Sequence, residues 1–325
     1  MTVALLLLVV GLAILIKGAD LLISGASSTA KKKGISNLTI GLTVVAFGTS
    51  MPELIVSLIA AVNEQSDASF GNVIGSNNFN LLFILGISGI IYPLTVQKNT
   101  VKFEIPISLM AAAILFLLIN DGILWGAEHN SLRRLDSVIL LLLFIGFMLY
   151  IYRTMSSTSE VGDGSPIKIY STPASIALIA FGVAMLVGGG TLVVENAISI
   201  AKHFGLSEKL IGLTILAAGT SLPELATSAV AAYRKNTDIA IGNVVGSNIF
   251  NILFILGITG AVNPIAYNPV MNFDIYVLLA STLLLMIFMF TLRQRKLDRW
   301  EAIMMLAGYI AYTVFLIGME EGLVS

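Results

Sequence analysis

The stretch Gly48-Thr49-Ser50-Met51-Pro52-Glu53 places a carboxylate, two hydroxyls and a proline inside a long apolar segment, and it recurs as Gly219-Thr220-Ser221-Leu222-Pro223-Glu224. Pro52 has no N–H to donate to the carbonyl of Gly48, so we expect the helix to break or kink there. A kink does not require a glutamate, and a carboxylate in an apolar segment is costly unless it serves a function. The two copies therefore predict a polar site built around Glu53 and Glu224.

The composition shows that this site lies in a membrane protein. Hydrophobic residues make up 57% of the 325 residues and charged residues only 11%, and the mean hydropathy is +0.93, far from the usage of soluble domains. The chain has no cysteine, which excludes thiolate metal sites and cysteine nucleophiles. Ser50 and Ser221 have no nearby histidine or lysine, which argues against an enzyme. We expect no cofactor, no nucleic acid and no protein partner. We expect the lipid bilayer to surround the protein.

Apolar stretches long enough to cross about 30 Å of hydrocarbon predict an all-α polytopic protein. The first stretch lacks a basic leader and a convincing cleavage site, so we interpret it as a retained helix. A polar stretch at 154–171 separates two predicted five-helix units, 1–153 and 172–325. The ten predicted transmembrane helices are 3–28, 36–62, 70–92, 102–119, 135–152, 172–200, 208–232, 241–263, 272–291 and 301–319.

The distribution of lysine and arginine predicts the orientation in the membrane. Thirteen of them fall on one side of the ten-helix arrangement and four on the other. The positive-inside rule then places both termini outside and the 154–171 linker in the cytoplasm, with the protein in the plasma (inner) membrane. The remaining cation, Lys17, is expected to pair with Asp20 one helical turn away.

The two copies belong to a longer internal repeat. An offset of 171 residues aligns Gly34 to Pro93 with Gly205 to Pro264 without a gap, and more than half of the positions are identical. Five predicted crossings separate the copies, so the second enters the membrane from the opposite side. Inverted repeats of this kind are common in secondary transporters, whose sites form near the midplane. A channel can also be built from duplicated halves, so the repeat alone favours a transporter without excluding a channel.

A second polar patch occurs in each repeat, as GNVIGSNNFN from Gly71 and GNVVGSNIFN from Gly242. Residues four apart share a helical face, which groups Asn72, Ser76 and Asn80 and, in the other copy, Asn243, Ser247 and Asn251. We expect Asn80 and Asn251 to line the site. On a different face, Asn77 and Asn248 are expected to serve as interhelical hydrogen-bonding groups or as caps at a helix break.

The paired motifs resemble the α-repeats of the sodium/calcium exchanger branch of the cation/calcium antiporter superfamily, over essentially the whole chain. The resemblance implies a ten-helix fold in which Glu53 and Glu224 bind Ca²⁺, helped by main-chain carbonyls at Thr49 and Thr220. It also implies Na⁺ sites that share the two glutamates. Their further oxygens would come from positions matching Ala46, Ser50, Ser76, Ala217, Ser221 and Ser247, with Asn80 and Asn251 near the centre.

Two departures from related exchangers narrow the coupling ion. Proton-coupled members typically carry a further glutamate in the second patch, where this chain has Gly75-Ser76-Asn77 and Gly246-Ser247-Asn248, so Na⁺ is favoured over H⁺. Potassium-dependent members have an aspartate where this chain has Asn251, which makes K⁺ coupling less favoured. The sequence therefore predicts an Na⁺/Ca²⁺ antiporter working by alternating access, electrogenic if more than two Na⁺ exchange for one Ca²⁺. An H⁺/Ca²⁺ exchanger, a K⁺-dependent exchanger and a cation channel are the alternatives.

The first helices of the two repeats, 3–28 and 172–200, are candidates for the moving part. They are long and rich in glycine and carry no ligand motif. A sliding surface needs small residues, although small residues equally serve static packing.

Overall fold

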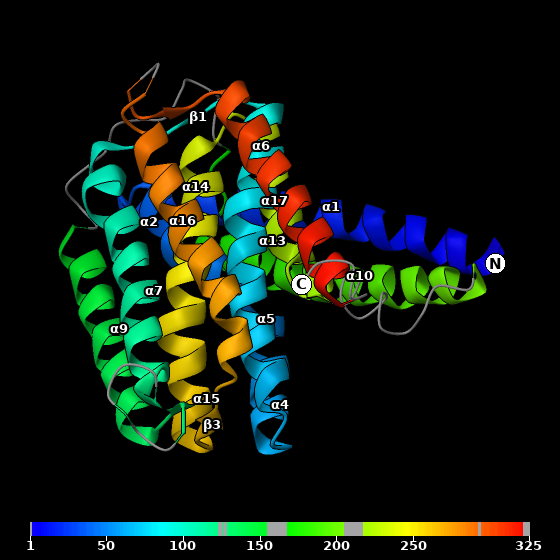
Figure 1. The fold of residues 1–325 in the computed structure, drawn as a ribbon. Helices are drawn as coiled ribbons and strands as arrows, with labels where there is room; N and C mark the ends of the chain where they lie inside the picture. Colours follow the sequence, from blue (N-terminus) through cyan, green and yellow to red (C-terminus); the bar gives the residue numbers. More distant parts are fainter. Residues whose placement is uncertain are drawn as a thin grey trace.

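The computed structural model describes residues 2–122, 126, 129–154, 168–204, 217–291 and 294–320, and this part of the chain is almost wholly helical (Figure 1). The first part of the chain contains α1 (Thr2–Lys33), α2 (Asn37–Ile40), η1 (Gly41–Val45), α3 (Ala46–Thr49), α4 (Met51–Val62), α5 (Ser66–Asn78), η2 (Phe79–Ile84), α6 (Leu85–Ile91), η3 (Thr100–Glu104), α7 (Ile105–Ile119) and α9 (Arg134–Thr154). The second part contains α10 (Thr172–His203), α12 (Ala217–Gly219), α13 (Leu222–Tyr233), α14 (Thr237–Ile249), η5 (Phe250–Ile255), α15 (Leu256–Val262), η6 (Pro269–Met271), α16 (Asn272–Phe288) and α17 (Arg299–Glu320).

Two short antiparallel strand pairs join connectors at opposite ends of the bundle. β1 (Leu94–Thr95) pairs with β4 (Lys296–Leu297), so that Leu94 faces Leu297. β2 (Ser131–Leu132) pairs with β3 (Ile265–Ala266), so that Leu132 faces Ile265. β1 and β3 lie at the two ends in Figure 1, so each pair ties a connector of the first half of the chain to one of the second half.

Most of the predicted membrane crossings are present as helices. Eight helices of the described residues are long and apolar enough to span a bilayer, and α2 to α4 form a ninth span bent by 47°. The predicted helix at 208–232 is described only in its second part, as α12 and α13, because 205–216 lie outside the described residues. The chain is thus a multi-pass helical membrane protein, and its ten-helix inverted arrangement stays a prediction.

The helix breaks where the proline motif predicts. α3 ends at Thr49 and α4 begins at Met51, with Ser50 between them at φ −83° and ψ 9°. Ser221 has nearly the same backbone angles, φ −89° and ψ 9°, before α13. Pro52 and Pro223 each lie in the first turn of the helix that follows, where a missing N–H costs little. Each motif therefore ends one helix and starts another.

Four π-helical segments of the described residues were not predicted. η3 directly precedes α7, and the other three lie beside the polar motifs. η1 precedes the first break, and η2 and η5 begin directly after α5 and α14, inside the second patch of each repeat. A π turn inserts an extra residue into the helix and is often found at functional sites. Asn80 and Asn251 lie within η2 and η5. The four-residue spacing of an α-helix therefore no longer gives the direction of their side chains.

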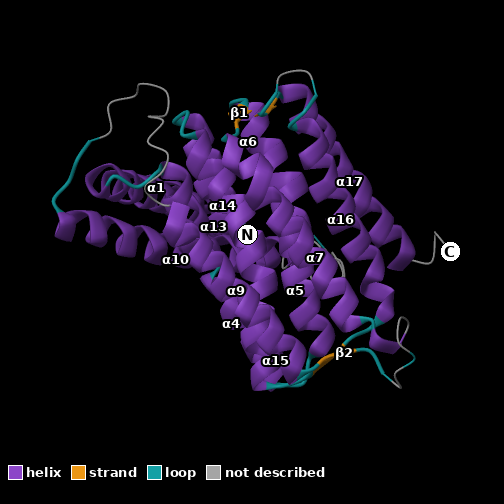
Figure 2. Ribbon diagram, turned by 90° about the vertical axis from the view of Figure 1, so that its left-hand side faces the viewer, coloured by secondary structure: helices purple, strands orange, loops and turns teal. Residues whose placement is uncertain are grey.

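α1 and α10 lie side by side and project from the bundle at a steep angle to the other helices (Figures 1 and 2). Both span 32 residues, longer than the predicted ranges. At their crossing the backbones touch: a Cβ added to Gly182 would lie 2.6 Å from the amide nitrogen of Leu22, and one added to Gly18 would lie 2.9 Å from the carbonyl oxygen of Gly182. Glycine is required here because the helices approach each other at backbone distance.

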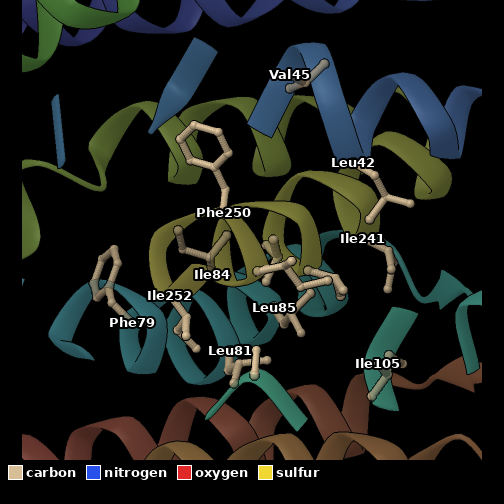
Figure 3. Close-up of a cluster of buried hydrophobic side chains, with 14 of the residues drawn as sticks. Leu42, Val45, Phe79, Leu81, Ile84, Leu85, Ile105, Ile241, Phe250 and Ile252 are labelled. Carbon is tan, nitrogen blue, oxygen red and sulfur yellow. The ribbon is translucent and has the colours of Figure 1, made fainter. Parts of the chain in front are cut away.

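The innermost layer consists of α5 with η2 and α14 with η5. Every residue of Ile239–Ile249 in α14 is buried, and the apolar side chains around this layer interlock in one cluster (Figure 3). Leu42 and Val45 of η1 contribute from one side, and Ile84 and Leu85 from the other. This packing holds the second patch of each repeat against the broken helices that carry the glutamates.

Candidate functional site

The two glutamates lie at the centre of the molecule. Glu53 is in the first turn of α4 and Glu224 in the first turn of α13, directly after each helix break. Their exposed fractions are 0% and 1%. Burying two carboxylates costs several kcal/mol per charge unless they are compensated, so the surroundings of these side chains decide what the site can do.

Each carboxylate is held by the serine of the other repeat. Ser50 Oγ donates to Glu224 Oε1 at 2.8 Å, and Ser221 Oγ donates to Glu53 Oε1 at 2.9 Å. Each break places its serine close to its glutamate in the chain. Each motif can therefore donate a hydrogen bond from its serine to the other motif and accept one on its glutamate. The second patch adds longer contacts, from Ser76 to Glu53 at 3.4 Å and from Ser247 to Glu224 at 3.5 Å.

Two asparagines connect the motifs, a role that the sequence did not assign to them. Asn72 Nδ2 donates to the main-chain oxygen of Glu53 at 3.1 Å and to Ser57 Oγ at 2.9 Å, and its Oδ1 accepts from Thr220 Oγ1 at 3.2 Å. The other copy repeats the pattern. Asn243 donates to the main-chain oxygen of Glu224 at 3.3 Å and to Ser228 at 2.9 Å, and accepts from Thr49 at 3.1 Å. Each asparagine follows its glutamate by 19 residues in both copies. This constant spacing is the sequence signal from which the contact could have been predicted.

Four further amides cross-link the two innermost helices. Asn77 Nδ2 donates to the main-chain oxygen of Asn248 at 3.3 Å, and Asn248 Nδ2 to that of Asn77 at 3.2 Å. Asn80 Nδ2 donates to Asn248 Oδ1 at 2.9 Å, and Asn251 Nδ2 to Asn77 Oδ1 at 3.0 Å. Asn77 and Asn248 are thus the interhelical hydrogen-bonding groups expected of them. Asn80 and Asn251 turn their amide nitrogens toward the opposite repeat.

Four buried oxygens at this centre have no hydrogen-bond donor among the described residues: Glu53 Oε2, Glu224 Oε2, Asn80 Oδ1 and Asn251 Oδ1. All four are acceptors, and they form two pairs related by the 171-residue offset. Buried polar atoms are nearly always satisfied in proteins. Unpaired oxygens with a formal charge of −2 match a hard cation, which takes carboxylate and carbonyl oxygens as ligands.

The remaining predicted ligands lie at the helix breaks. Thr49 is fully buried in the last turn of α3, and Thr220 is partly buried between α12 and α13. The carbonyl of Ala46 accepts from the N–H of Ser50 at 3.0 Å and from Thr49 Oγ1 at 3.3 Å. Ala217 begins α12, and nothing is described of its side chain. The structure thus brings the serines, glutamates and asparagines together, and the ligand roles of these side chains and of the four main-chain carbonyls stay predictions.

Two acidic residues outside the centre are bound by tyrosines, and Glu104 Oε2, like Oε2 of Glu53 and Glu224, has no hydrogen-bond donor among the described residues. Within the described ranges, no place gathers three or more histidine, aspartate or glutamate side chains. Glu104 accepts from the hydroxyl of Tyr150 at 2.6 Å, and Asp274 from that of Tyr312 at 2.7 Å. These two acids therefore each have a tyrosine partner on the following long helix, and they take no part in the central cluster.

Comparisons with known proteins agree with this geometry. The family model described as "Sodium/calcium exchanger protein" matches residues 3–153 and 174–318. The inner membrane protein YrbG of Escherichia coli is 33% identical over 100% of both chains. The sodium/calcium exchanger MaX1 of Methanosarcina acetivorans is 32% identical over 97% of this chain and 99% of its own.

A solved structure supports the same relationship. The sodium-calcium exchanger NCX_Mj, in crystals soaked with zero Na⁺ and Ca²⁺, superposes with a TM-score of 0.81 at 32% identity, covering 96% of this chain and 98% of that one. The family model, the full-length relatives and the shared fold lead to one conclusion. The chain belongs to the sodium/calcium exchanger family.

Proposed function

We propose that the protein is a secondary antiporter that exchanges Na⁺ for Ca²⁺ across the plasma membrane by alternating access. The observation that carries this proposal is the group of four buried, unpaired acceptor oxygens on Glu53, Glu224, Asn80 and Asn251. The relatives named sodium/calcium exchanger support the choice of ions.

The charge at the centre supports exchange over leak. One Ca²⁺ neutralises the two carboxylates, and Na⁺ ions can neutralise the same pair with help from Ser50, Ser221, Ser76 and Ser247. Both ions then compete for the same charge. An empty site would carry two uncompensated charges through the conformational change, at a cost of several kcal/mol per ion. That cost disfavours return of the empty carrier.

The polar groups around the carboxylates favour Na⁺ as the coupling ion. The second patch, where proton-coupled relatives would add a glutamate, contains no carboxylate in either repeat of this chain. Ser76 and Ser247 of this patch approach the carboxylates of Glu53 and Glu224. An amide at Asn251 leaves the centre with two carboxylates, which disfavours K⁺ coupling. If more than two Na⁺ exchange for each Ca²⁺, each net charge moved couples to the membrane potential at about 2.3 kcal/mol per 100 mV.

The experiment that tests this proposal measures ⁴⁵Ca²⁺ uptake into proteoliposomes loaded with Na⁺, K⁺ or choline. Uptake is expected only with internal Na⁺, and it should respond to an imposed voltage. Glu53→Gln and Glu224→Gln should each lower it at least about 100-fold, because each removes half of the neutralising charge. Glu104→Gln is the matched control, since it alters a buried glutamate outside the site.

Other outcomes would replace the proposal with a specific alternative. Uptake driven by a pH gradient without Na⁺ would identify an H⁺/Ca²⁺ exchanger. A requirement for K⁺ together with Na⁺ would identify a K⁺-dependent exchanger. Ca²⁺ flux with no counter-ion at all would identify a channel. Full Na⁺-dependent exchange in either carboxylate variant would show that the central site is elsewhere.

A further inference from the structure

A set of polar contacts fastens α1 to the connector between α13 and α14. Arg234, at the end of α13, forms an ion pair with Asp20 of α1 and donates to Ser24 Oγ at 3.0 Å. Two residues later, Asn236 Nδ2 donates to Ser27 Oγ at 3.2 Å. The predicted partner, Lys17, lies 3.5 Å from Asp20, but Lys17 is on the same helix and fixes nothing between helices. We call Asp20, Ser24, Ser27, Arg234 and Asn236 the α1 latch.

The equivalent positions of the other repeat cannot form these contacts. An offset of 171 residues replaces Asp20 by Thr191, Ser24 by Glu195 and Ser27 by Ile198. It replaces Arg234 by Asn63 and Asn236 by Gln65. The latch is therefore present once in a molecule whose central contacts are present twice.

The packing of the two long helices follows the same asymmetry. α1 packs along α13, and Thr227, on the face of α13 that leads to Arg234, is fully buried. Its equivalent on α4, Val56, is 41% exposed. A cavity of about 490 Å³ lies between α10, α4 and α5, and it is lined by Val56 and by the site residues Asn72 and Thr220. We call the approach to the site along α13 the α13 route and the approach along α4 the α4 route. The α13 route is covered by α1, whereas α10 leaves the α4 route uncovered.

We propose that the α1 latch holds the carrier in the state seen here, with the α13 route closed and the α4 route open. This inference rests on the proposed alternating access, because it assigns the contacts that must break when the α13 route opens. Asp20 and Arg234 are both only partly buried, so the pair can separate and each charge can be rehydrated. The latch then sets the balance between the two states without touching the ions.

Cysteine labelling tests the latch directly, because the natural chain contains no cysteine. Val56→Cys and Thr227→Cys report on the two routes, and neither position belongs to the ion site. In lipid nanodiscs without an ion gradient, a small charged maleimide should label Val56→Cys quickly and Thr227→Cys slowly. Adding Arg234→Asn, the residue of the other repeat, should raise the rate at Thr227→Cys by about tenfold as the closed state loses its preference.

The matched control is Lys235→Asn. It removes one positive charge from the same connector without touching α1, and asparagine tolerates its positive φ of 59°. This variant should leave both labelling rates unchanged. Equal rates at Thr227→Cys in the Arg234→Asn and Lys235→Asn backgrounds would overturn the latch.

Transplanting the latch keeps the proposal testable if Arg234→Asn folds poorly. Thr191→Asp with Asn63→Arg places the same ion pair in the other repeat, where it can form only if α10 approaches α4. Labelling at Val56→Cys should then fall and labelling at Thr227→Cys should rise, whereas Asn63→Arg alone should do neither. An unchanged pattern in the double variant would contradict the latch.

The labelling outcome and the transport outcome are separable. If the labelling shifts as expected but Na⁺-dependent Ca²⁺ uptake is absent, the latch stands and the proposed ions are wrong. If exchange is present and the labelling does not shift, the proposed function stands and the latch is wrong.

Discussion

The centre of this protein is nearly the same in both repeats, whereas its flanks are not. Ser50 and Ser221 bind the opposite glutamates at nearly equal distances, 2.8 and 2.9 Å. Beyond the centre, α13 is covered by α1 and carries the fully buried Thr227, while α4 carries the 41% exposed Val56. Two copies of one motif thus have different surroundings in a single state.

The difference between centre and flanks indicates, under the proposed function, that the duplicated chain does two things: the centre binds ions, and the flanks control access to it. A centre that both repeats build equally can offer the same ligands to ions arriving from either side. Under the proposed alternating access, the flanking contacts decide which side is connected to this centre, and they must differ in any one state. We therefore expect central substitutions to act alike in the two repeats and flanking substitutions to act differently.

The largest effect is expected where α1 and α10 cross, since both repeats depend on that contact. Gly182→Val would place side-chain atoms where Leu22 N already lies 2.6 Å from an added Cβ, so the helices must separate at a cost of about 3 kcal/mol. The melting temperature in detergent measures the loss. Gly188→Val is the control, because an added Cβ there meets no described atom within 4 Å; equal losses would show that the crossing is not the cause.

The next effect tests whether the centre is symmetric. Ser50→Ala and Ser221→Ala each remove a hydrogen bond to a buried carboxylate, and each should weaken Ca²⁺ binding by about 2 kcal/mol, or roughly 30-fold. Isothermal titration at fixed Na⁺ measures both affinities. A difference of more than about tenfold between the two variants would break the proposed equivalence of the repeats.

A smaller effect extends the comparison to the outer helices. Tyr150→Phe and Tyr312→Phe remove the hydroxyls that donate to Glu104 and Asp274, and each should cost about 1 to 2 kcal/mol of stability. Thermal unfolding measures the cost. Ca²⁺ affinity should be unchanged in both, since these acids lie outside the central cluster; a large change in affinity would place one of them in the site.

The smallest effect is expected on the open flank. Glu195 lines the cavity between α10, α4 and α5, where a carboxylate attracts cations on their way to the site. Glu195→Gln should raise the Ca²⁺ concentration for half-maximal uptake by about threefold at low salt, and by less at high salt because of screening. Glu104→Gln is the comparison variant, because Glu104 does not line this cavity. An effect that does not depend on salt would contradict a steering role.

Much of the site could be predicted because its physical causes are local. Pro52 and Pro223 remove a backbone donor wherever they occur in a helix, so the breaks beside them follow from the sequence. A buried carboxylate is costly wherever it lies, so its recurrence at a constant offset identified Glu53 and Glu224 as a pair. The interhelical role of Asn77 and Asn248 likewise follows from placing amides on an apolar face.

Other features depend on contacts between distant segments and could not be predicted. The π turns η2 and η5 lie in the innermost layer, and Asn80 and Asn251 within them donate to amide oxygens of the opposite repeat. The interhelical partner of Asp20 is Arg234, more than 200 residues away, whereas the sequence suggested only the neighbouring Lys17.

The sequence by itself determined that the chain is a helical membrane protein with two equivalent broken helices, each carrying one carboxylate. Composition, proline and the 171-residue offset are properties of the chain, and their consequences hold in any packing. Only the tertiary structure decided that each glutamate is bound by the serine of the other repeat and that α1 covers α13 while α10 leaves α4 open. These features depend on contacts between residues that are far apart in the chain, and such pairings cannot be inferred from either half alone.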